Sequence, residues 1–235
     1  MTPSSLYILA LDTATTGCSV TVWRGGDDFG DVLAHDARSM TRGQAEMLLP
    51  MVQDALHAAG IVPQNLDAIA VTRGPGAFTG MRIGLAAARG LALSLGIPCI
   101  GVTTLEAVAR GVEGQEHPIL AAVESKREDI YVQVFDAKFN PLGEPQAANG
   151  AALAELVGTT PMVAVGDAAQ RAQDMLHAEG VQILLSEASQ LPDTRVVARL
   201  AADRFVAEKD TPPPEPIYLR PPDAKLPQNQ GRARA

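Results

Sequence analysis

Residues 67–84 read DAIAVTRGPGAFTGMRIG and join a short apolar run to a glycine-rich turn and the start of a helix. The run at 67–72 predicts a buried strand, because a few consecutive apolar residues bounded by turn residues are typical of one. A helix-forming stretch follows from about residue 79 to 95. The order strand, turn and helix favours an α/β protein.

Further strands and helices are expected on both sides of this segment. Strands are expected at 6–11, 19–23 and 31–37, before a helix from Thr41 to about Ala59 that ends at Gly60. Thr41-Arg42-Gly43-Gln44 and Thr103-Thr104-Leu105-Glu106 both match the capping box, in which side chains bond free N–H groups at a helix start. Further strands are expected at 97–102, 119–123, 130–135, 162–165 and 181–185, and further helices from Thr103, at 149–157, at 168–178 and from Asp193 to about Glu208.

The length of 235 residues suits one large domain or two small ones. The polar, glycine-containing stretch 111–118 is the expected boundary. We therefore expect an N-terminal domain at 1–112 and a smaller C-terminal domain at 113–219. Residues 220–235 are rich in proline and polar residues and predict a flexible tail.

Composition limits the classes of function. The net charge of −8 disfavours a broad tRNA-binding surface, so that any RNA role would be indirect or shared with a partner. Cys18 and Cys99 lie far apart in apolar runs and predict buried, reduced thiols. The apolar run after Met1 ends at Asp12, too short for a signal peptide or a membrane span. We expect a cytoplasmic protein.

Two turns are candidate phosphate sites. Asp12-Thr13-Ala14 ends the first strand where phosphotransferases of the actin/hexokinase class carry Asp-x-Gly-Thr, but Ala14 replaces the glycine; the alternative is a turn that merely ends the strand. Gly74–Gly80 offers N–H groups at a helix start. It fails both the dinucleotide and the P-loop patterns, and the alternative is a rigid turn. The candidate nucleotide-binding residues are Asp12, Thr13, Gly74, Gly76 and Thr79.

Small residues recur along the helix at 79–95. Gly80, Gly84, Ala88 and Ala92 are four residues apart and therefore share one face. A glycine inside a helix costs about 1 kcal/mol relative to alanine, and Gly84 and Gly90 suggest that another backbone approaches closely. That neighbour is either a partner protein or this chain's own sheet.

The preceding helix, which starts near Thr41, has apolar residues on more than one face. A single sheet can cover only one of these faces. The methionines of this helix suit an adaptable contact surface, and Pro50 is expected to kink it. Both helices together predict a docking surface for a partner. Its expected residues are Met47, Leu48, Met51, Val52, Gly80, Met81, Gly84 and Ala88.

No catalytic or metal-ligating residues are expected. The histidines, at 35, 57, 117 and 177, are too scattered for helix-borne ligands. The chain has no Cys-x-x-Cys and no Gly-x-Ser-x-Gly, and it offers no convincing nucleophile–base pair.

Four blocks of sequence, at 8–15, 44–50, 67–84 and 101–106, resemble the TsaB (YeaZ) family. The pattern Arg-Gly-Pro-Gly-x-Phe-Thr-Gly-x-Arg-x-Gly at 73–84 is highly specific. The match is dense over 6–110 and looser afterwards, at 125–132 and 218–221. The resemblance implies an actin/hexokinase-like (ASKHA) fold of two ribonuclease H-like domains, with mixed sheets flanked by helices.

The resemblance also implies a function. The chain would be the non-catalytic subunit of a complex that transfers a threonylcarbamoyl group to N6 of adenosine 37 in tRNAs reading ANN codons. It would pair with the catalytic paralogue TsaD, join the ATPase TsaE and tRNA, and form a homodimer when alone. It would have no cofactor of its own, although ATP or ADP could bind at the interface with the partner.

One substitution separates this chain from the catalytic paralogue. Where TsaD carries His-x-x-x-His, this sequence has Thr104 and Val108, which are poor ligands for a transition metal. The rival hypothesis is a nucleotide-dependent phosphotransferase or ATPase that uses the Asp12 turn and the Gly74–Gly80 loop. A glycoprotein peptidase is disfavoured because the residues for that chemistry are missing.

Overall fold

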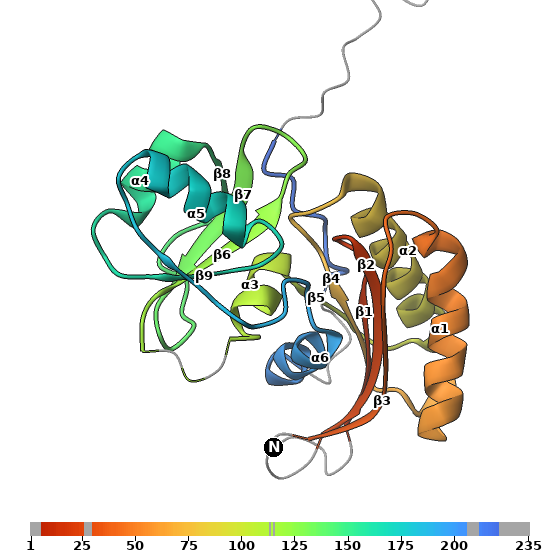
Figure 1. Ribbon diagram of the computed structural model, residues 1–235. Coiled ribbons are helices and arrows are strands. Elements are labelled where there is room, and N and C mark those ends of the chain that lie inside the picture. Colours follow the sequence, from red (N-terminus) through yellow and green to blue (C-terminus); the bar gives the residue numbers. More distant parts are fainter. Residues whose placement is uncertain (1–5, 26–29, 113, 115, 206–211, 221–235) are drawn as a thin grey trace, which may run out of the picture.

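The computed structural model describes residues 6–25, 30–112, 114, 116–205 and 212–220. They form two mixed five-stranded sheets flanked by helices, as the α/β expectation required (Figure 1). The first sheet has the order β3-β2-β1-β4-β5 and the second has the order β10-β9-β6-β7-β8. In each, three consecutive antiparallel strands are extended by two parallel strands.

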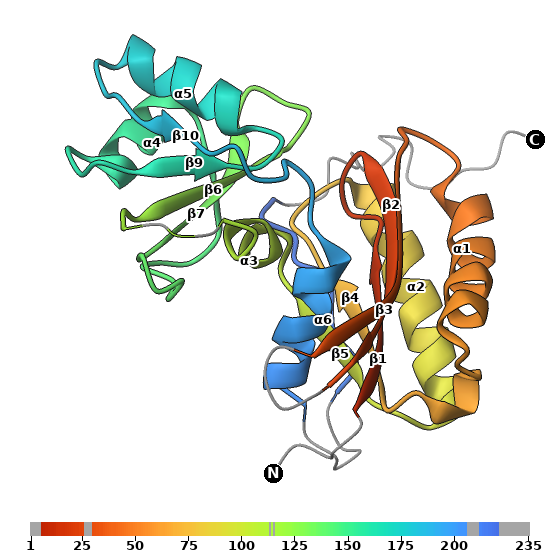
Figure 2. The same ribbon diagram turned by 60° about the horizontal axis from the view of Figure 1, so that its bottom comes forward.

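The first sheet is built from the N-terminal half. Its strands are β1 (Tyr7–Asp12), β2 (Gly17–Arg24), β3 (Asp31–Ser39), β4 (Ala68–Thr72) and β5 (Cys99–Val102). Successive side chains of β1 point to opposite faces. Leu9 and Leu11 pack under α1 (Gln44–Ala59) and α2 (Phe78–Leu95), whereas Ile8 and Ala10 pack against α6 (Thr194–Asp203). Helices therefore cover both faces of this sheet (Figure 2).

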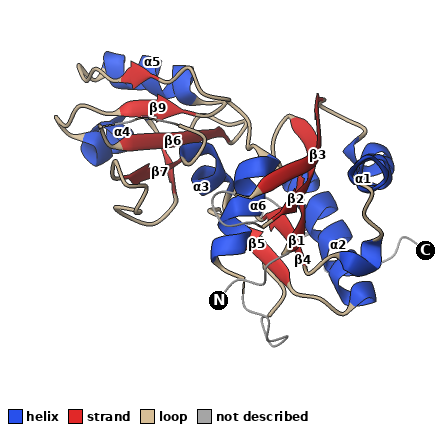
Figure 3. Cartoon of the chain, turned by 90° about the horizontal axis from the view of Figure 1, so that it is seen from below, coloured by secondary structure: helices blue, strands red, loops and turns tan. Residues whose placement is uncertain are grey.

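The second sheet is smaller. Its strands are β6 (Ile119–Glu124), β7 (Ile130–Phe135), β8 (Gln146–Ala148), β9 (Val163–Val165) and β10 (Leu184–Leu185). Leu120 packs with α4 (Gly150–Val157) and α5 (Ala169–Ala178), and Ile119 packs with α3 (Thr104–Ala109). Helices α3 and α6 lie between the two sheets (Figure 3). A short 3-10 helix, Pro63–Asn65, precedes β4.

The expected helix caps have different outcomes. The Thr103 hydroxyl accepts a hydrogen bond from Glu106 N at 3.0 Å, which confirms the second capping box. Asn149 and Asp193 cap α4 and α6 as predicted. The first capping box is wrong: Gly43 has a left-handed backbone with φ 91°, so that α1 begins only at Gln44 and lacks a side-chain cap.

The other boundaries are close to those expected, with two exceptions. Helix α6 ends at Asp203, earlier than residue 208. Strand β10 covers only Leu184–Leu185 of the expected 181–185. Helix α1 is continuous through Pro50 and ends at Ala59, and its C-cap is Gly60, which has φ 66°.

The sheets change between β5 and β6, across the expected boundary at 112. That division stays a prediction, but the C-terminal segments do not all follow it. Helix α6 packs on β1 and β2, and Arg89 of α2 donates a hydrogen bond of 2.7 Å to Pro214 O. Helix α6 and Pro214 therefore pack with elements of the N-terminal half. Of the expected tail, only Arg220 is described.

Both cysteines are buried and unpaired, as expected. Among the described residues, no helix is both long and apolar enough to span a bilayer.

Candidate functional site

The turn after β1 is buried inside the protein. Asp12 is 2% exposed, and its Oδ1 accepts hydrogen bonds from Thr72 Oγ1 at 2.5 Å and from Ala14 N at 3.1 Å. Burial raises the pKa of this carboxyl group to about 6, although the bond from Thr72 opposes the shift. Asp12 therefore holds the turn together from within.

The glycines of α2 pack against this same turn. The hydroxyl of Thr13 donates a hydrogen bond of 2.7 Å to Gly80 O. A Cβ atom on Gly80 would lie 2.1 Å from Thr13 O, and one on Gly76 would lie 2.2 Å from Ala14 O. Gly84 would meet the Thr13 hydroxyl at 2.7 Å. Close packing within the chain thus accounts for these glycines.

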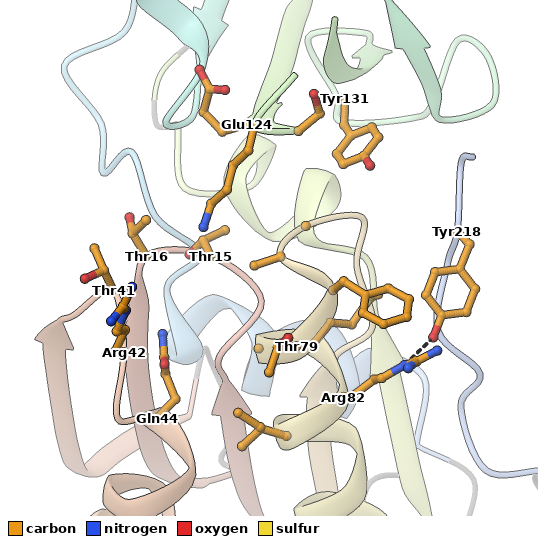
Figure 4. Close-up of a pocket in the computed structure, with 18 of the residues that line it drawn as sticks. Thr15, Thr16, Thr41, Arg42, Gln44, Thr79, Arg82, Glu124, Tyr131 and Tyr218 are labelled. Atoms are coloured by element: carbon orange, nitrogen blue, oxygen red, sulfur yellow. Dashed lines mark hydrogen bonds between the residues drawn. The ribbon is translucent and has the colours of Figure 1, made fainter. Parts of the chain in front are cut away.

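A cleft of about 990 Å³ opens beside the turn, between the first sheet, the β6–β7 hairpin and the C-terminal segment (Figure 4). Of the candidate nucleotide-binding residues, Gly76 and Thr79 line it. Asp12 and Thr13 are buried, and Gly74, with φ 94°, is covered by Met81 and Ile217. The structure therefore does not bring all five to one accessible surface, and a nucleotide site there stays a prediction.

The lining of the cleft comes from segments distant in the sequence. In Figure 4, Tyr131 of the hairpin faces Thr79 and Arg82 of α2 across the opening, whereas the side chain of Glu124 points away from them. The cleft lining consists of residues 15–16, 41–46, 76–83, 124–127, 131 and 217–220. Sequence reasoning did not assign the hairpin or the C-terminal segment to a site, since only the tertiary fold brings them together.

An aromatic cluster fixes the C-terminal segment at the edge of the cleft. The Arg82 guanidinium lies 3.6 Å from the ring centre of Phe78, and its Nε donates a hydrogen bond of 2.9 Å to Tyr218 OH. Ile217 N donates to Arg73 O at 2.8 Å, and Arg220 forms an ion pair with Asp129 of the hairpin. The segment thus contacts both halves of the protein.

The expected docking residues lie mostly inside the core. Leu48, Met51, Val52, Met81 and Ala88 are buried between the first sheet and the two helices, Gly80 and Gly84 are also buried, and Met47 is partly buried. Their placement on an exposed surface was therefore wrong, because the first sheet covers this face.

The opposite face of the two helices is open. Leu49 of α1 is 49% exposed and Leu93 of α2 is 85% exposed. Apart from its chain neighbours and the backbone of α2 itself, no atom lies within 4 Å of where a Cβ on Gly90 would be. Because both faces of α1 carry apolar residues, the sequence did not reveal which face the sheet covers.

The described residues contain no group of three or more histidine, cysteine, aspartate or glutamate side chains that could hold a metal ion. Thr104 and Val108, on α3, are both buried, and Val108 belongs to the core between α3 and the second sheet.

Comparisons with known proteins agree with this geometry. A family model described as TsaD, tRNA N6-adenosine threonylcarbamoyltransferase, matches residues 32–191. The Escherichia coli tRNA threonylcarbamoyladenosine biosynthesis protein TsaB is 33% identical over 92% of this chain and 95% of its own length.

Two further proteins broaden the comparison. A tRNA N6-adenosine threonylcarbamoyltransferase from Jannaschia sp. is 37% identical over 44% of this chain and 33% of its own length. YeaZ from Pseudomonas aeruginosa superposes with a TM-score of 0.69 and 26% identity, over 91% of this chain and all of that one. Together with the pair of mixed sheets, these findings show that the chain belongs to the TsaB (YeaZ) family.

Proposed function

We propose that this chain is a non-catalytic subunit of the complex that adds a threonylcarbamoyl group to N6 of adenosine 37 in tRNAs reading ANN codons. The single observation that carries the proposal is the similarity to TsaB of Escherichia coli over nearly the whole of both chains. Thr104 and Val108, at the positions where the catalytic paralogue has histidines, support a role without metal chemistry.

The outer face of α1 and α2 is the proposed docking surface for the catalytic paralogue TsaD. Leu49 and Leu93 expose apolar area there, and Gly90 leaves a stretch of helix backbone uncovered. A glycine inside a helix costs about 1 kcal/mol, and no contact within this chain offsets that cost at Gly90. A partner helix that packs on Gly90 would offset it.

Docking would hold TsaD in a shape competent for transfer and would help to create a site for the ATPase TsaE. tRNA would join through the complex, and the same face would form a homodimer when TsaD is absent. Two helices of 16 and 18 residues are long enough for an interface of standard size. ATP or ADP at the interface belongs to the same proposal.

The rival function is a phosphotransferase or ATPase that works alone. The close packing of Gly76 and Gly80 on the Thr13-Ala14 turn disfavours it, since the backbone that would approach a phosphate already contacts this turn. Calorimetry of the isolated protein with ATP and magnesium distinguishes the two. Tight binding with turnover would favour the rival.

The docking test uses Leu93→Asp, with Leu142→Asp as the matched control on another exposed leucine. Light scattering of each variant mixed with TsaD gives the mass of the complex. The activity is tRNA modification with TsaD, TsaE and TsaC, the enzyme of this system that makes threonylcarbamoyl-adenylate. We expect Leu93→Asp to lose both and the control to retain both. Full activity without this chain, or an intact complex with Leu93→Asp, would contradict the proposal.

A further inference from the structure

The cleft carries positive charge in an acidic protein. Arg42, Arg82, Lys126, Arg127 and Arg220 line it, against the two carboxylates of Glu46 and Glu124, whereas the whole chain has a net charge of −8. Glu124 is engaged by Arg171 at 2.8 Å, and Arg220 is likewise paired with Asp129. Arg42 and Lys126 have no ion-pair partner among the described residues. This charge reversal attracts an anionic ligand.

The cleft also holds polar groups that lack partners. Both α1 and α2 begin at the cleft, and neither has a side-chain cap, unlike α3, α4 and α6. Free N–H groups at a helix start bind anions such as phosphate. Thr15, between them, is 5% exposed, and its hydroxyl has no hydrogen-bond partner (Figure 4). The Thr15 oxygen is itself shut off from solvent, so the free N–H groups at the helix starts, not this hydroxyl, are what the cleft offers an anion.

Lys126 occupies an unusual backbone conformation at the cleft. Its φ of 59° is in the left-handed region, which costs a residue with a Cβ atom on the order of 1 kcal/mol. Glycine or asparagine would occupy this turn more easily. An ammonium group that binds a ligand explains a lysine here.

Aromatic rings at the edge of the cleft indicate the kind of anion. Phe78 is 52% exposed and Tyr218 is 45% exposed, with ring centres 5.6 Å apart, and Tyr131 lines the facing hairpin. Exposed rings beside cations are typical of sites that stack the bases of single-stranded nucleic acid. The cations come from separate segments of chain, and the volume is near the upper end of the range for small-molecule pockets, about 300–1,000 Å³. The spread of the cations and the size of the cleft fit a ligand with several phosphates better than a ligand with one.

We propose that this cleft binds a single-stranded segment of RNA, with phosphates near Lys126 and the start of α2 and bases on Phe78 and Tyr218. The site is separate from the outer face of α1 and α2, so that the inference goes beyond the proposed docking function. It replaces the expectation, drawn from the net charge, that this chain contacts RNA only indirectly.

The test measures fluorescence anisotropy of a labelled, uridine-rich RNA of about a dozen nucleotides with the full chain. We expect salt-sensitive binding that Lys126→Glu weakens at least fivefold, whereas Lys138→Glu, an exposed lysine outside the cleft, leaves it unchanged. Phe78→Ala removes a stacking surface and should weaken binding about fivefold or more. Leu142→Ala is its control on an exposed leucine. Thermal unfolding of each variant verifies that the fold is retained.

Several outcomes would overturn the proposal. One is that the unmodified chain does not bind RNA at low salt. Another is that Lys126→Glu and Lys138→Glu have equal effects. A third is that binding is lost only when residues 221–235 are removed. ATP or a polyaspartate peptide that binds while the RNA does not would identify another occupant. Complex formation with TsaD is measured in parallel on the same variants, so that failure here is distinguishable from failure of docking.

Discussion

The hydroxyl of Thr13 donates a hydrogen bond of 2.7 Å to the carbonyl oxygen of Gly80 and so joins the end of β1 to the first turn of α2. The contact requires that neither Gly80 nor Gly76 carry a side chain, because each Cβ atom would lie close to 2 Å from a backbone oxygen. The conspicuous glycines of the sequence thus position α2 on the sheet and direct its N-terminus at the cleft.

Two glycines of α2 should respond to alanine in opposite directions. Gly80→Ala places a Cβ atom 2.1 Å from Thr13 O and should lower the free energy of unfolding by roughly 1–3 kcal/mol or more. Gly90→Ala enters open space and should raise it by about 0.5–1 kcal/mol through helix propensity. Urea unfolding measures both. A destabilising Gly90→Ala would mean that the helix is covered there within this chain.

Asp12 should make the protein less stable as pH rises. Its pKa is raised from 3.8 to about 6 in the folded state, so that between these values the folded chain keeps a proton that the unfolded chain has lost. Stability contributed by this group therefore falls from about pH 4 to pH 6, by on the order of 3 kcal/mol. Asp12→Asn should remove this slope in urea unfolding at a series of pH values.

Asp136 provides a control of opposite sign. Hydrogen bonds from Asn140 lower the pKa of its carboxyl group, so its contribution is present above the unfolded pKa and is lost as pH falls. Asp136→Asn should therefore leave the fall between pH 4 and pH 6 in place. An unchanged slope in Asp12→Asn would show that Asp12 is not the group responsible.

Removal of a helix cap should depend on which threonine is changed. Thr103→Ala deletes the acceptor of the Glu106 N–H group and should cost about 1 kcal/mol of unfolding free energy. Thr41→Ala should cost little, because α1 begins at Gln44 and Thr41 caps nothing. Equal losses in chemical denaturation would contradict the assignment of Gly43 as the N-cap of α1.

Arg89 should control the opening of the C-terminal segment. Its guanidinium donates to Pro214 O at 2.7 Å, three residues before Ile217, whose N–H group bonds Arg73 O. Arg89→Ala loses a hydrogen bond from a charged group. It should therefore raise the equilibrium constant for local opening of this segment roughly tenfold or more. Hydrogen exchange of the peptide containing Ile217 measures it, and Arg24→Ala, on an exposed arginine of β2, is the control. Unchanged exchange would mean that other contacts hold the segment.

Much of the fold could be predicted from the sequence because hydrophobic periodicity and capping residues act locally. The strands around Asp12 and the caps at Thr103, Asn149 and Asp193 follow from neighbouring residues alone. The predicted start of α1 at Thr41 was wrong. The capping-box pattern takes no account of the left-handed backbone conformation that Gly43 adopts.

The candidate site was harder to predict because it depends on contacts between distant segments. The cleft joins Thr15, Lys126 and Tyr218, and no local signal relates them. The predicted docking residues belong to helices that are apolar on more than one face. Only the packing of the folded chain shows that Met51 faces the sheet and Leu49 does not.

The position of helix α6 late in the sequence affects how the chain folds while the ribosome synthesises it. The Thr21 hydroxyl meets that of Thr194 at 2.7 Å, across a separation of 173 residues. While a ribosome is still making the second half, Ile8 and Ala10 on that side of β1 lack the helix that covers them, because Val197 and Ala201 have not yet been synthesised. Nascent chains that stall before this helix should therefore be clients of chaperones, and a fragment cut after residue 112 should aggregate rather than fold.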